Sequence, residues 1–286
     1  MNPYRQFVDS HVLLLQEGKS LPLGGIAEPP KAPLEPNASV ALLFSPHPDD
    51  ECITGGLALR LLRETKMRVV NVAVTQGSNR ERQAARWREL KNACDWIGFG
   101  LERTAPNGLE KINPKTRLSD PTHWTGAVKT IAATLARYRP RVVVFPHEHD
   151  WNSTHIGTHF LVMDALQSLP ADFHCLLIES EFWGQMISPN LMVESSADDV
   201  AALLTALSFH VGEVQRNPYH LRLPGWLIDN VRRGAELVGG QGGVAPEFTF
   251  ATLYRVSHWK NGRVEEAYVG GKQIAVGESP AQVLGI

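Results

Sequence analysis

Short apolar runs of strand length alternate with longer segments of helical spacing along this 286-residue chain, and this alternation restricts the fold more than any other feature. The runs, such as VALLFS at 40–45, are apolar throughout, which is typical of parallel strands covered by helices on both faces. The expected strands are 40–45, 67–75, 141–146 and 173–180, and the expected helices between them are 56–65, 79–98, 126–138 and 154–169. The sequence therefore predicts an α/β fold, a Rossmann-like three-layer parallel sheet flanked by helices.

The first part of the chain departs from this pattern. A short amphipathic helix is expected over 5–17, followed by a Pro- and Gly-rich stretch over 21–39. Such a stretch is typical of an extended connection on the surface and not of a core element. We therefore expect residues 1–38 to be an N-terminal helix with a wrapping segment.

Residues 39–286 are expected to form a single α/β catalytic domain, of which 184–286 is a less regular C-terminal α+β extension. Two helices are predicted there, over 197–209 and 224–237. A β-hairpin should turn at Asn261, because Asn-Gly is a strong signal for a two-residue hairpin turn.

Composition excludes several classes of protein. The formal net charge is −2, so no general basic field attracts nucleic acid or an anionic membrane. No apolar run reaches the roughly 18 residues of a membrane span, and the first residues do not resemble a secretory signal. Three cysteines without paired spacing suit a reducing compartment. We expect a cytoplasmic protein whose partner is a small molecule, with no nucleic acid and no membrane span.

Charged residues gather at two places where a predicted strand ends. SPHPDDE (45–51) follows one strand, and PHEHDWNSTH (146–155) follows another. In open parallel sheets, ligands bind beyond the carboxyl ends of the strands. The two clusters should therefore lie on the same edge of the sheet.

The residue types in these clusters are those that hold a catalytic metal ion. Such an ion usually takes three ligands from His, Asp, Glu or Cys and leaves one position for water. His47 and Asp50 can face one centre if the chain turns after Pro46, and His155 is the best candidate for a third ligand. Asp49 then lies beside the metal, where a carboxylate can take a proton from metal-bound water.

Ordinary structural roles compete with this interpretation. Asp49 and Asp50 could cap the helix that starts near Thr54, and a lone histidine is more often solvated or hydrogen-bonded. The two clusters together favour the metal site, because the second holds four histidines within thirteen residues: His147, His149, His155 and His159.

SPHPDDE resembles the Ala-His-Pro-Asp-Asp-Glu motif of the LmbE-like, or PIG-L, zinc-dependent deacetylases, which include enzymes that deacetylate N-acetylglucosaminyl conjugates. Residues 74–99 are similar to the family's strand, Gly-containing loop and helix, and 141–159 to its histidine motif. The resemblance covers residues 38–180 and weakens beyond.

The resemblance implies that His47, Asp50 and His155 bind one Zn²⁺ ion per chain, with Asp49 as general base. Glu51 would be a supporting residue that helps to orient the ligands. Fe²⁺ or Mn²⁺ would suit the same ligands. A homo-oligomer would also agree with the family.

One segment departs from the family. Many members have His-Pro-Asp-His where residues 152–155 are Asn-Ser-Thr-His, so the histidine that protonates the leaving amine is missing. Asn152 can donate a hydrogen bond to an oxyanion but cannot act as an acid. We favour His149 as the proton donor, although it could be a solvated loop histidine. His159, His210 and Asp49 itself are alternatives.

The resulting prediction is a zinc-dependent amide hydrolase that removes an N-acetyl group from an N-acetylglucosamine-type conjugate, with Asp49 activating the zinc-bound water. Substrate specificity is expected in the loops at 105–125, 180–196 and 212–225.

Two alternatives stay open. The first is a zinc-dependent hydratase that adds water to a small unsaturated carboxylate, for which Arg80 and Arg82 supply positive charge. The second is a non-catalytic binding domain stabilised by metal, which would need a fourth protein ligand such as His149 or Asp150.

Overall fold

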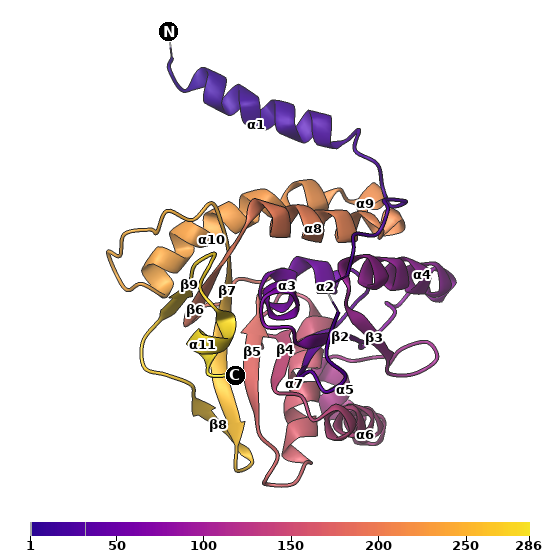
Figure 1. The fold of residues 1–286 in the computed structure, drawn as a ribbon. Coiled ribbons are helices and arrows are strands. Elements are labelled where there is room, and N and C mark those ends of the chain that lie inside the picture. Colours follow the sequence, from indigo (N-terminus) through magenta and orange to yellow (C-terminus); the bar gives the residue numbers. More distant parts are fainter. Residues whose placement is uncertain (1, 32) are drawn as a thin grey trace.

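Figure 1 shows the computed structural model, which describes residues 2–31 and 33–286. The strands are β1 (Val40–Ser45), β2 (Arg68–Ala73), β3 (Gly100–Arg103), β4 (Val142–Pro146), β5 (Cys175–Ser180), β6 (Leu191–Ser195), β7 (Phe250–Lys260), β8 (Arg263–Glu266) and β9 (Lys272–Ile274). They form one nine-stranded sheet in the order β3-β2-β1-β4-β5-β7-β6-β9, with β8 paired to β7.

Helices cover both faces of the sheet (Figure 1). The helices of the described chain are α1 (Arg5–Gly18), α2 (Asp50–Ile53), α3 (Gly55–Arg63), α4 (Arg80–Ile97), α5 (Pro114–Ser119), α6 (Pro121–Tyr138), α7 (Ser153–Gln167), α8 (Ala197–Ser208), α9 (Val211–Arg216), the 3₁₀-helix η1 (Tyr219–Leu221), α10 (Leu223–Leu237) and α11 (Pro280–Leu284), and all but α1 pack with the sheet or its neighbouring helices. One apolar core lies between the sheet and the helices α3, α4 and α8, and another lies against α6 and α7. Among the described residues, no helix has both the length and the apolar character that crossing a bilayer demands.

The predicted α/β architecture is confirmed. Strands β1 to β5 are parallel, and β7 joins β5 and β6 through antiparallel pairing. The predicted hairpin is also present, between β7 and β8. Its turn residues Asn261 and Gly262 both have positive φ, 53° and 72°, as a type I′ turn requires.

All three segments expected to be specificity loops contain regular structure instead. The range 212–225 includes most of α9, all of η1 and the start of α10. The range 105–125 includes α5 and the start of α6, where Asp120 caps α6 by accepting a hydrogen bond from the backbone N–H of His123. The range 180–196 includes β6, which pairs with β7 inside the sheet. The partner that stabilises β6 is distant in sequence, whereas the Asp120 cap of α6 is a local signal.

The strand order determines where a ligand can bind. From the adjacent pair β1 and β4, the sheet continues through β2 and β3 on one side and through β5 on the other. The crevice at the carboxyl ends of β1 and β4 is therefore the topological switch point of the sheet, where ligands bind in open α/β folds. The segments 45–51 and 146–155 begin at these two strand ends.

Helix α1 stands apart from the rest of the molecule in Figure 1. Its apolar residues are mostly exposed, including Phe7, Val12 and Leu14. Gly18, at its end, is buried, and a Cβ there would lie 2.8 Å from the side chain of Leu221.

Candidate active site

The first cluster folds into a tight loop directly after β1. The chain turns at Pro46 and enters the short helix α2 at Asp50. The backbone N–H of His47 donates a hydrogen bond to Asp50 Oδ2 at 2.8 Å. This bond brings the His47 and Asp50 side chains together, as their spacing of three residues predicts.

His155 meets these two side chains from the first turn of α7. His47 Nδ1 lies 3.2 Å from His155 Nε2 and 3.4 Å from Asp50 Oδ2, and His155 Nε2 lies 3.3 Å from Asp50 Oδ2. A tetrahedral ion with ligand bonds of about 2.0–2.1 Å separates neighbouring ligand atoms by about 3.3 Å. The three residues therefore fit an ion of the zinc type, and no fourth protein ligand joins this group within the described chain.

Asp150 lies behind His155, on the side of the ring away from this centre. Its Oδ1 is 3.6 Å from His155 Nδ1. The backbone N–H groups of Trp183 and Gly184 donate to Asp150 Oδ2, each at 3.0 Å, and the N–H of Asn152 donates to Oδ1 at 2.8 Å. A carboxylate held in this way orients a ligating histidine through its second ring nitrogen.

Asp49 is 6% exposed and sits in a strained backbone conformation beside the cluster. Its φ of 109° is unusual for any residue other than glycine. Its backbone N–H donates to Glu51 Oε2 at 3.0 Å, which holds this conformation. The Tyr219 hydroxyl donates to Asp49 Oδ2 at 2.6 Å, and Arg86 Nη2 lies 3.8 Å from Oδ1. The Asp49 side chain makes no helix-capping hydrogen bond, so the capping interpretation of this residue is wrong.

Glu51 forms a second buried pair under this loop. Its Oε1 lies 2.6 Å from His210 Nε2, and both side chains are fully buried. His210 comes from the junction of α8 and α9. The pair anchors the C-terminal part of the chain to the loop that carries Asp49.

The charges in the cluster are complementary to a cation. Burial would raise the pKa of Asp50, but His155 and His47 outweigh it and hold that pKa well below the usual range. Burial opposes protonation of His155, yet Asp50 and Asp150 raise its pKa to about 9. Burial and the neighbouring charge of Asp50 raise the pKa of Asp49 to about 7. A bound metal ion would take over the positive charge that a proton on His155 supplies.

The other predicted site residues are more dispersed. Asn152 caps α7, since its Oδ1 accepts a hydrogen bond from the N–H of Thr154 at 2.8 Å. The His149 side chain is 65% exposed, with its Nε2 3.8 Å from Glu148. His147 is buried, and its Nε2 lies 3.0 Å from the carbonyl of Gly184.

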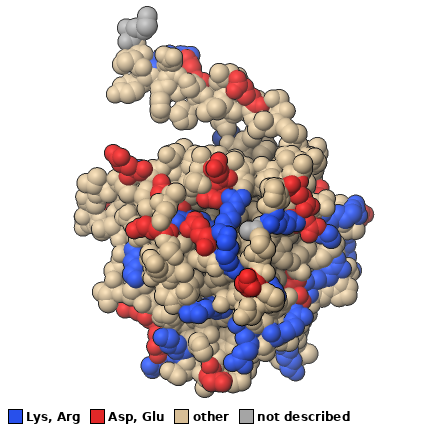
Figure 2. Space-filling view, in the orientation of Figure 1, with Lys and Arg blue, Asp and Glu red and all other residues tan. Residues whose placement is uncertain are grey.

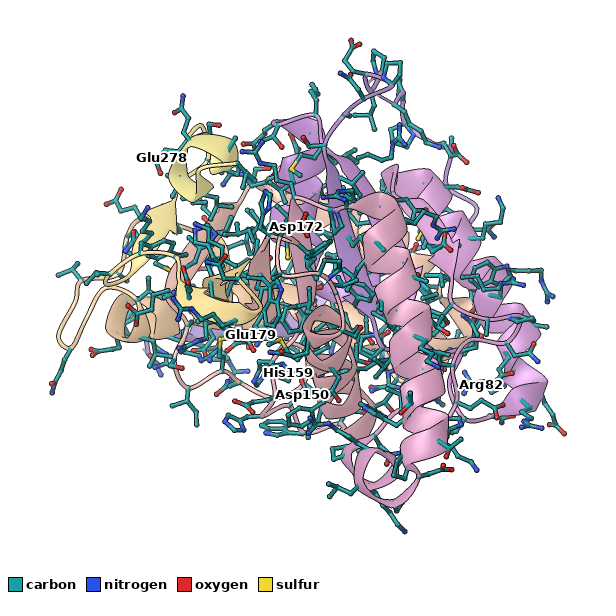
Figure 3. All side chains as sticks on the ribbon, turned by 90° about the horizontal axis from the view of Figure 1, so that it is seen from below. Arg82, Asp150, His159, Asp172, Glu179 and Glu278 are labelled. Atoms are coloured by element: carbon teal, nitrogen blue, oxygen red, sulfur yellow. The ribbon has the colours of Figure 1, made fainter. Side chains whose placement is uncertain are left out.

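His159 faces away from the three-residue cluster. Its Nδ1 lies 3.0 Å from the carbonyl of Pro146 and 3.2 Å from Glu179 Oε1. Figure 3 shows the labelled His159 and Glu179 side chains close together.

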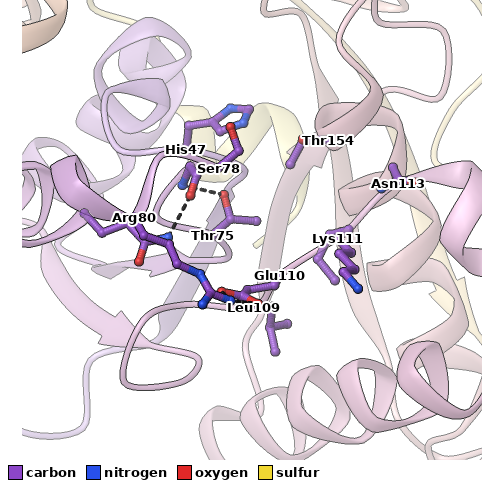
Figure 4. A pocket seen from close by; sticks show the side chains of 12 residues that line it. His47, Thr75, Ser78, Arg80, Leu109, Glu110, Lys111, Asn113 and Thr154 are labelled. Atoms are coloured by element: carbon purple, nitrogen blue, oxygen red, sulfur yellow. Dashed lines mark hydrogen bonds and ion pairs between the residues drawn. The ribbon is translucent and has the colours of Figure 1, made fainter.

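A cleft of about 350 Å³ opens at His47 (Figure 4). In the figure, His47 and Ser78 lie on one side of it and Asn113 and Lys111 on the other. Arg80 lines the cleft and makes an ion pair with Glu110 at 3.0 Å. Arg82 does not line it and pairs instead with Glu213.

Sequence reasoning missed the two residues that the C-terminal part brings to the site. The sequence places Tyr219 in an expected specificity loop, and no local pattern indicates that it reaches Asp49. His210 is one of the alternative proton donors that the sequence offers, and no pattern indicates its pairing with Glu51.

The model of the PIG-L family, described as GlcNAc-PI de-N-acetylase, matches residues 42–166. The matched segment carries the three clustered residues and Asp49, whereas Tyr219 and His210 lie outside it. No curated protein matches the sequence.

Several solved structures share the fold of this chain. N,N'-diacetylchitobiose deacetylase from Pyrococcus horikoshii has a TM-score of 0.57 and 17% identity, covering 90% of this chain and 93% of its own. The A40926 pseudoaglycone deacetylase has a TM-score of 0.55 and 13% identity, covering 78% and 98%. The 4-carboxy-2-hydroxymuconate hydratase from Pseudomonas putida KT2440 has a TM-score of 0.54 and 15% identity, covering 76% and 95%. Because deacetylases and a hydratase share it, the fold alone does not determine the reaction.

Proposed function

We propose that this PIG-L protein is a metal-dependent amide hydrolase that removes an acetyl group from an N-acetylglucosamine-type conjugate. The observation that carries the proposal is the triangle of His47, Asp50 and His155 with Asp49 beside it, at the mouth of a cleft. The family description and the deacetylases of the same fold support the amide substrate.

The chain's own residues supply ligands, a base and orientation. His47, Asp50 and His155 would hold Zn²⁺, or Fe²⁺ or Mn²⁺. A metal ion at these ligands would polarise the amide carbonyl and make water more acidic. Asp49 accepts the proton of the attacking water, and the hydrogen bond from Tyr219 fixes the direction in which its carboxylate points.

The leaving amine needs a proton after the carbonyl–nitrogen bond breaks. Asp49 is our first candidate to return the proton that it accepted, because it is the buried carboxylate beside the ligands. His149 stays the second candidate, and Asn152 could donate to the oxyanion through its amide nitrogen.

Three protein ligands favour catalysis over a purely structural metal site, which normally has four. Of the two candidates for a fourth ligand, Asp150 contacts the far nitrogen of His155 and His149 is exposed.

We propose a small-molecule substrate and, from the composition, a cytoplasmic location.

The test is release of primary amine from a panel of N-acetylglucosamine conjugates by the Zn²⁺-loaded protein. The matched control is Asp49→Asn, which should keep one metal ion per chain and lose about 10²-fold or more of turnover. His149→Gln, measured in parallel, separates the two candidate proton donors. If metal-loaded wild type releases no amine from any conjugate, the amide hydrolase proposal is wrong. The hydratase would then be tested by loss of conjugated-diene absorbance.

A further inference from the structure

A cleft of about 500 Å³ lies at the edge of the sheet opposite the candidate active site. It is lined by residues at the starts of β1, β4 and β5 and at the end of β7. Strand β1 joins the two edges, since it begins in this cleft at Val40 and ends two residues before His47. A strand of this length spans about 20 Å, so the cleft is separate from the chemistry described above.

The lining of this cleft is rich in cationic side chains. Arg139 and Arg141 come from the connection between α6 and β4, and Lys260 comes from the end of β7. His174 and His258 add two imidazole rings, and no Asp or Glu side chain lines the cleft. In the described part of the chain, none of the three permanent cations has a carboxylate within ion-pair distance. Their charges are therefore available to a ligand.

Arg139 has a backbone conformation that favours glycine. It ends α6 with φ of 42° and ψ of 57°, in the left-handed region, and its backbone N–H donates to the carbonyl of Leu135 at 2.9 Å. Glycine is the usual residue at such a helix end, because a Cβ is sterically disfavoured there. Residues held in this kind of strain cluster at functional sites. The arginine at this position therefore points to a use for its side chain.

The sheet fixes the backbone that carries the two arginines. The N–H of Arg141 donates to the carbonyl of Val40 at 2.8 Å, and the carbonyl of Arg141 accepts from the N–H of Leu176 at 2.9 Å. Pro140 lies between the arginines, is buried and has a restricted φ. A backbone fixed in this way reduces the entropy that the arginines lose when a ligand binds.

The charge and size of the cleft favour a small phosphorylated molecule. A phosphoryl group carries a charge of about −1.5 to −2 at pH 7, which suits three cations better than a singly charged carboxylate does. A guanidinium binds its oxygen atoms through paired hydrogen bonds. The volume lies within the roughly 300–1,000 Å³ of small-molecule sites.

A nucleic acid fits these observations less well. Figure 2 shows basic side chains over the lower part of the molecule, around the place where Figure 1 marks the C-terminus, with acidic side chains among them. The formal net charge of the chain is −2. Positive charge is thus concentrated in the cleft and does not extend into a continuous basic surface of the kind that a polyanion needs.

We propose that this cleft binds the phosphoryl group of a small molecule. Arg139 and Arg141 donate hydrogen bonds to its oxygen atoms, and Lys260 supplies a third positive charge. The site does not depend on the proposed amide hydrolysis, because it lies at the other edge of the sheet.

The experiment titrates inorganic phosphate and glycerol 3-phosphate into the full-length, metal-loaded protein and follows the heat of binding. Both should bind, because they share the phosphoryl group, whereas glycerol should not. Arg139→Gln and Arg141→Gln should each weaken both affinities about tenfold or more. Arg88→Gln is the matched control and should keep both affinities, since Arg88 is an exposed arginine on α4 that lies outside the cleft.

Three results would overturn the inference. The first is no binding of either compound up to about 10 mM. The second is wild-type affinity in both cleft variants, which would place the phosphate elsewhere, such as at the metal ion. The third is binding of inorganic phosphate alone, which would exclude a phosphorylated molecule. The titration needs no turnover, so its outcome is independent of the test for amine release.

Arg139→Gly gives a second readout that a purely structural arginine would not produce. It should raise the melting temperature of the free protein, because glycine adopts the left-handed conformation without strain. It should also weaken the binding of glycerol 3-phosphate about tenfold, as Arg139→Gln does. A lower melting temperature with unchanged affinity would show that Arg139 serves packing alone.

Discussion

The hydroxyl of Tyr219 donates a 2.6 Å hydrogen bond to Oδ2 of Asp49, joining two residues that are 170 positions apart in the chain. Tyr219 lies in η1, outside the segment that matches the PIG-L model. The residue proposed as the general base is therefore oriented by a part of the chain that the family comparison does not include.

Tyr219→Phe should lower kcat about tenfold while KM and metal content change little, because one hydrogen bond to a charged group is lost. Steady-state kinetics and metal analysis measure this. Tyr138→Phe is the matched control, since its hydroxyl also donates to a carboxylate, that of Glu102 at 3.0 Å, and no contact joins it to the site. An unchanged kcat in Tyr219→Phe would remove this residue from the positioning of Asp49.

His155→Ala should abolish stoichiometric metal binding, because it removes one of three ligands. His159→Ala, one turn further along α7, should keep the metal, since its ring contacts Pro146 and Glu179 instead. Elemental analysis after dialysis measures both. Adding a chelator should lower the melting temperature of wild type and of His159→Ala but not of His155→Ala, because the ion binds only the folded state. Equal metal content in the two variants would contradict the assigned ligand set.

His210→Ala should destabilise the protein by about 3 kcal/mol, because it leaves the Glu51 carboxylate buried without its partner. Denaturant unfolding measures this loss. The double variant Glu51→Gln/His210→Ala should be less destabilised than the sum of the two single variants. Strict additivity would mean that the two residues do not act as a pair.

Glu179 should contribute stability that is lost as pH rises between about 4.5 and 7. Burial raises the pKa of Glu179 from 4.5 to about 7, against the lowering effect of Arg255. In this window the folded protein keeps a proton that the unfolded chain has released, so each increase in pH favours unfolding.

The size of this contribution is on the order of 2 kcal/mol, allowing for partial exposure of the side chain. Glu179→Gln should lose that part of the pH dependence. The melting temperature of the variant minus that of wild type should therefore be larger at pH 8 than at pH 5. Melting curves of both proteins across this range measure the difference. Parallel curves would contradict the raised pKa.

Much of the fold follows from local pattern. Strands β1 and β4 are apolar on both faces, so their sequences alone indicate buried parallel strands, and the polar segments after them mark the edge where a ligand binds. Strand β6 could not be predicted, because Leu191–Ser195 is stabilised by pairing with Phe250–Tyr254 of β7 and with β9, both far along the chain. Strand propensity depends strongly on such neighbours.

The site, too, combines contacts that local sequence predicts with contacts that only the folded chain brings together. The sequence by itself determined that His47 and Asp50 face one centre, because a spacing of three residues in a turning loop is a local property. Only the tertiary structure decided that Asp150 supports His155, that Tyr219 and His210 reach the Asp49 loop, and that Arg139 and Lys260 line one cleft. Hydrogen bonding across the fold depends on how distant segments pack, and no spacing along the chain encodes that packing.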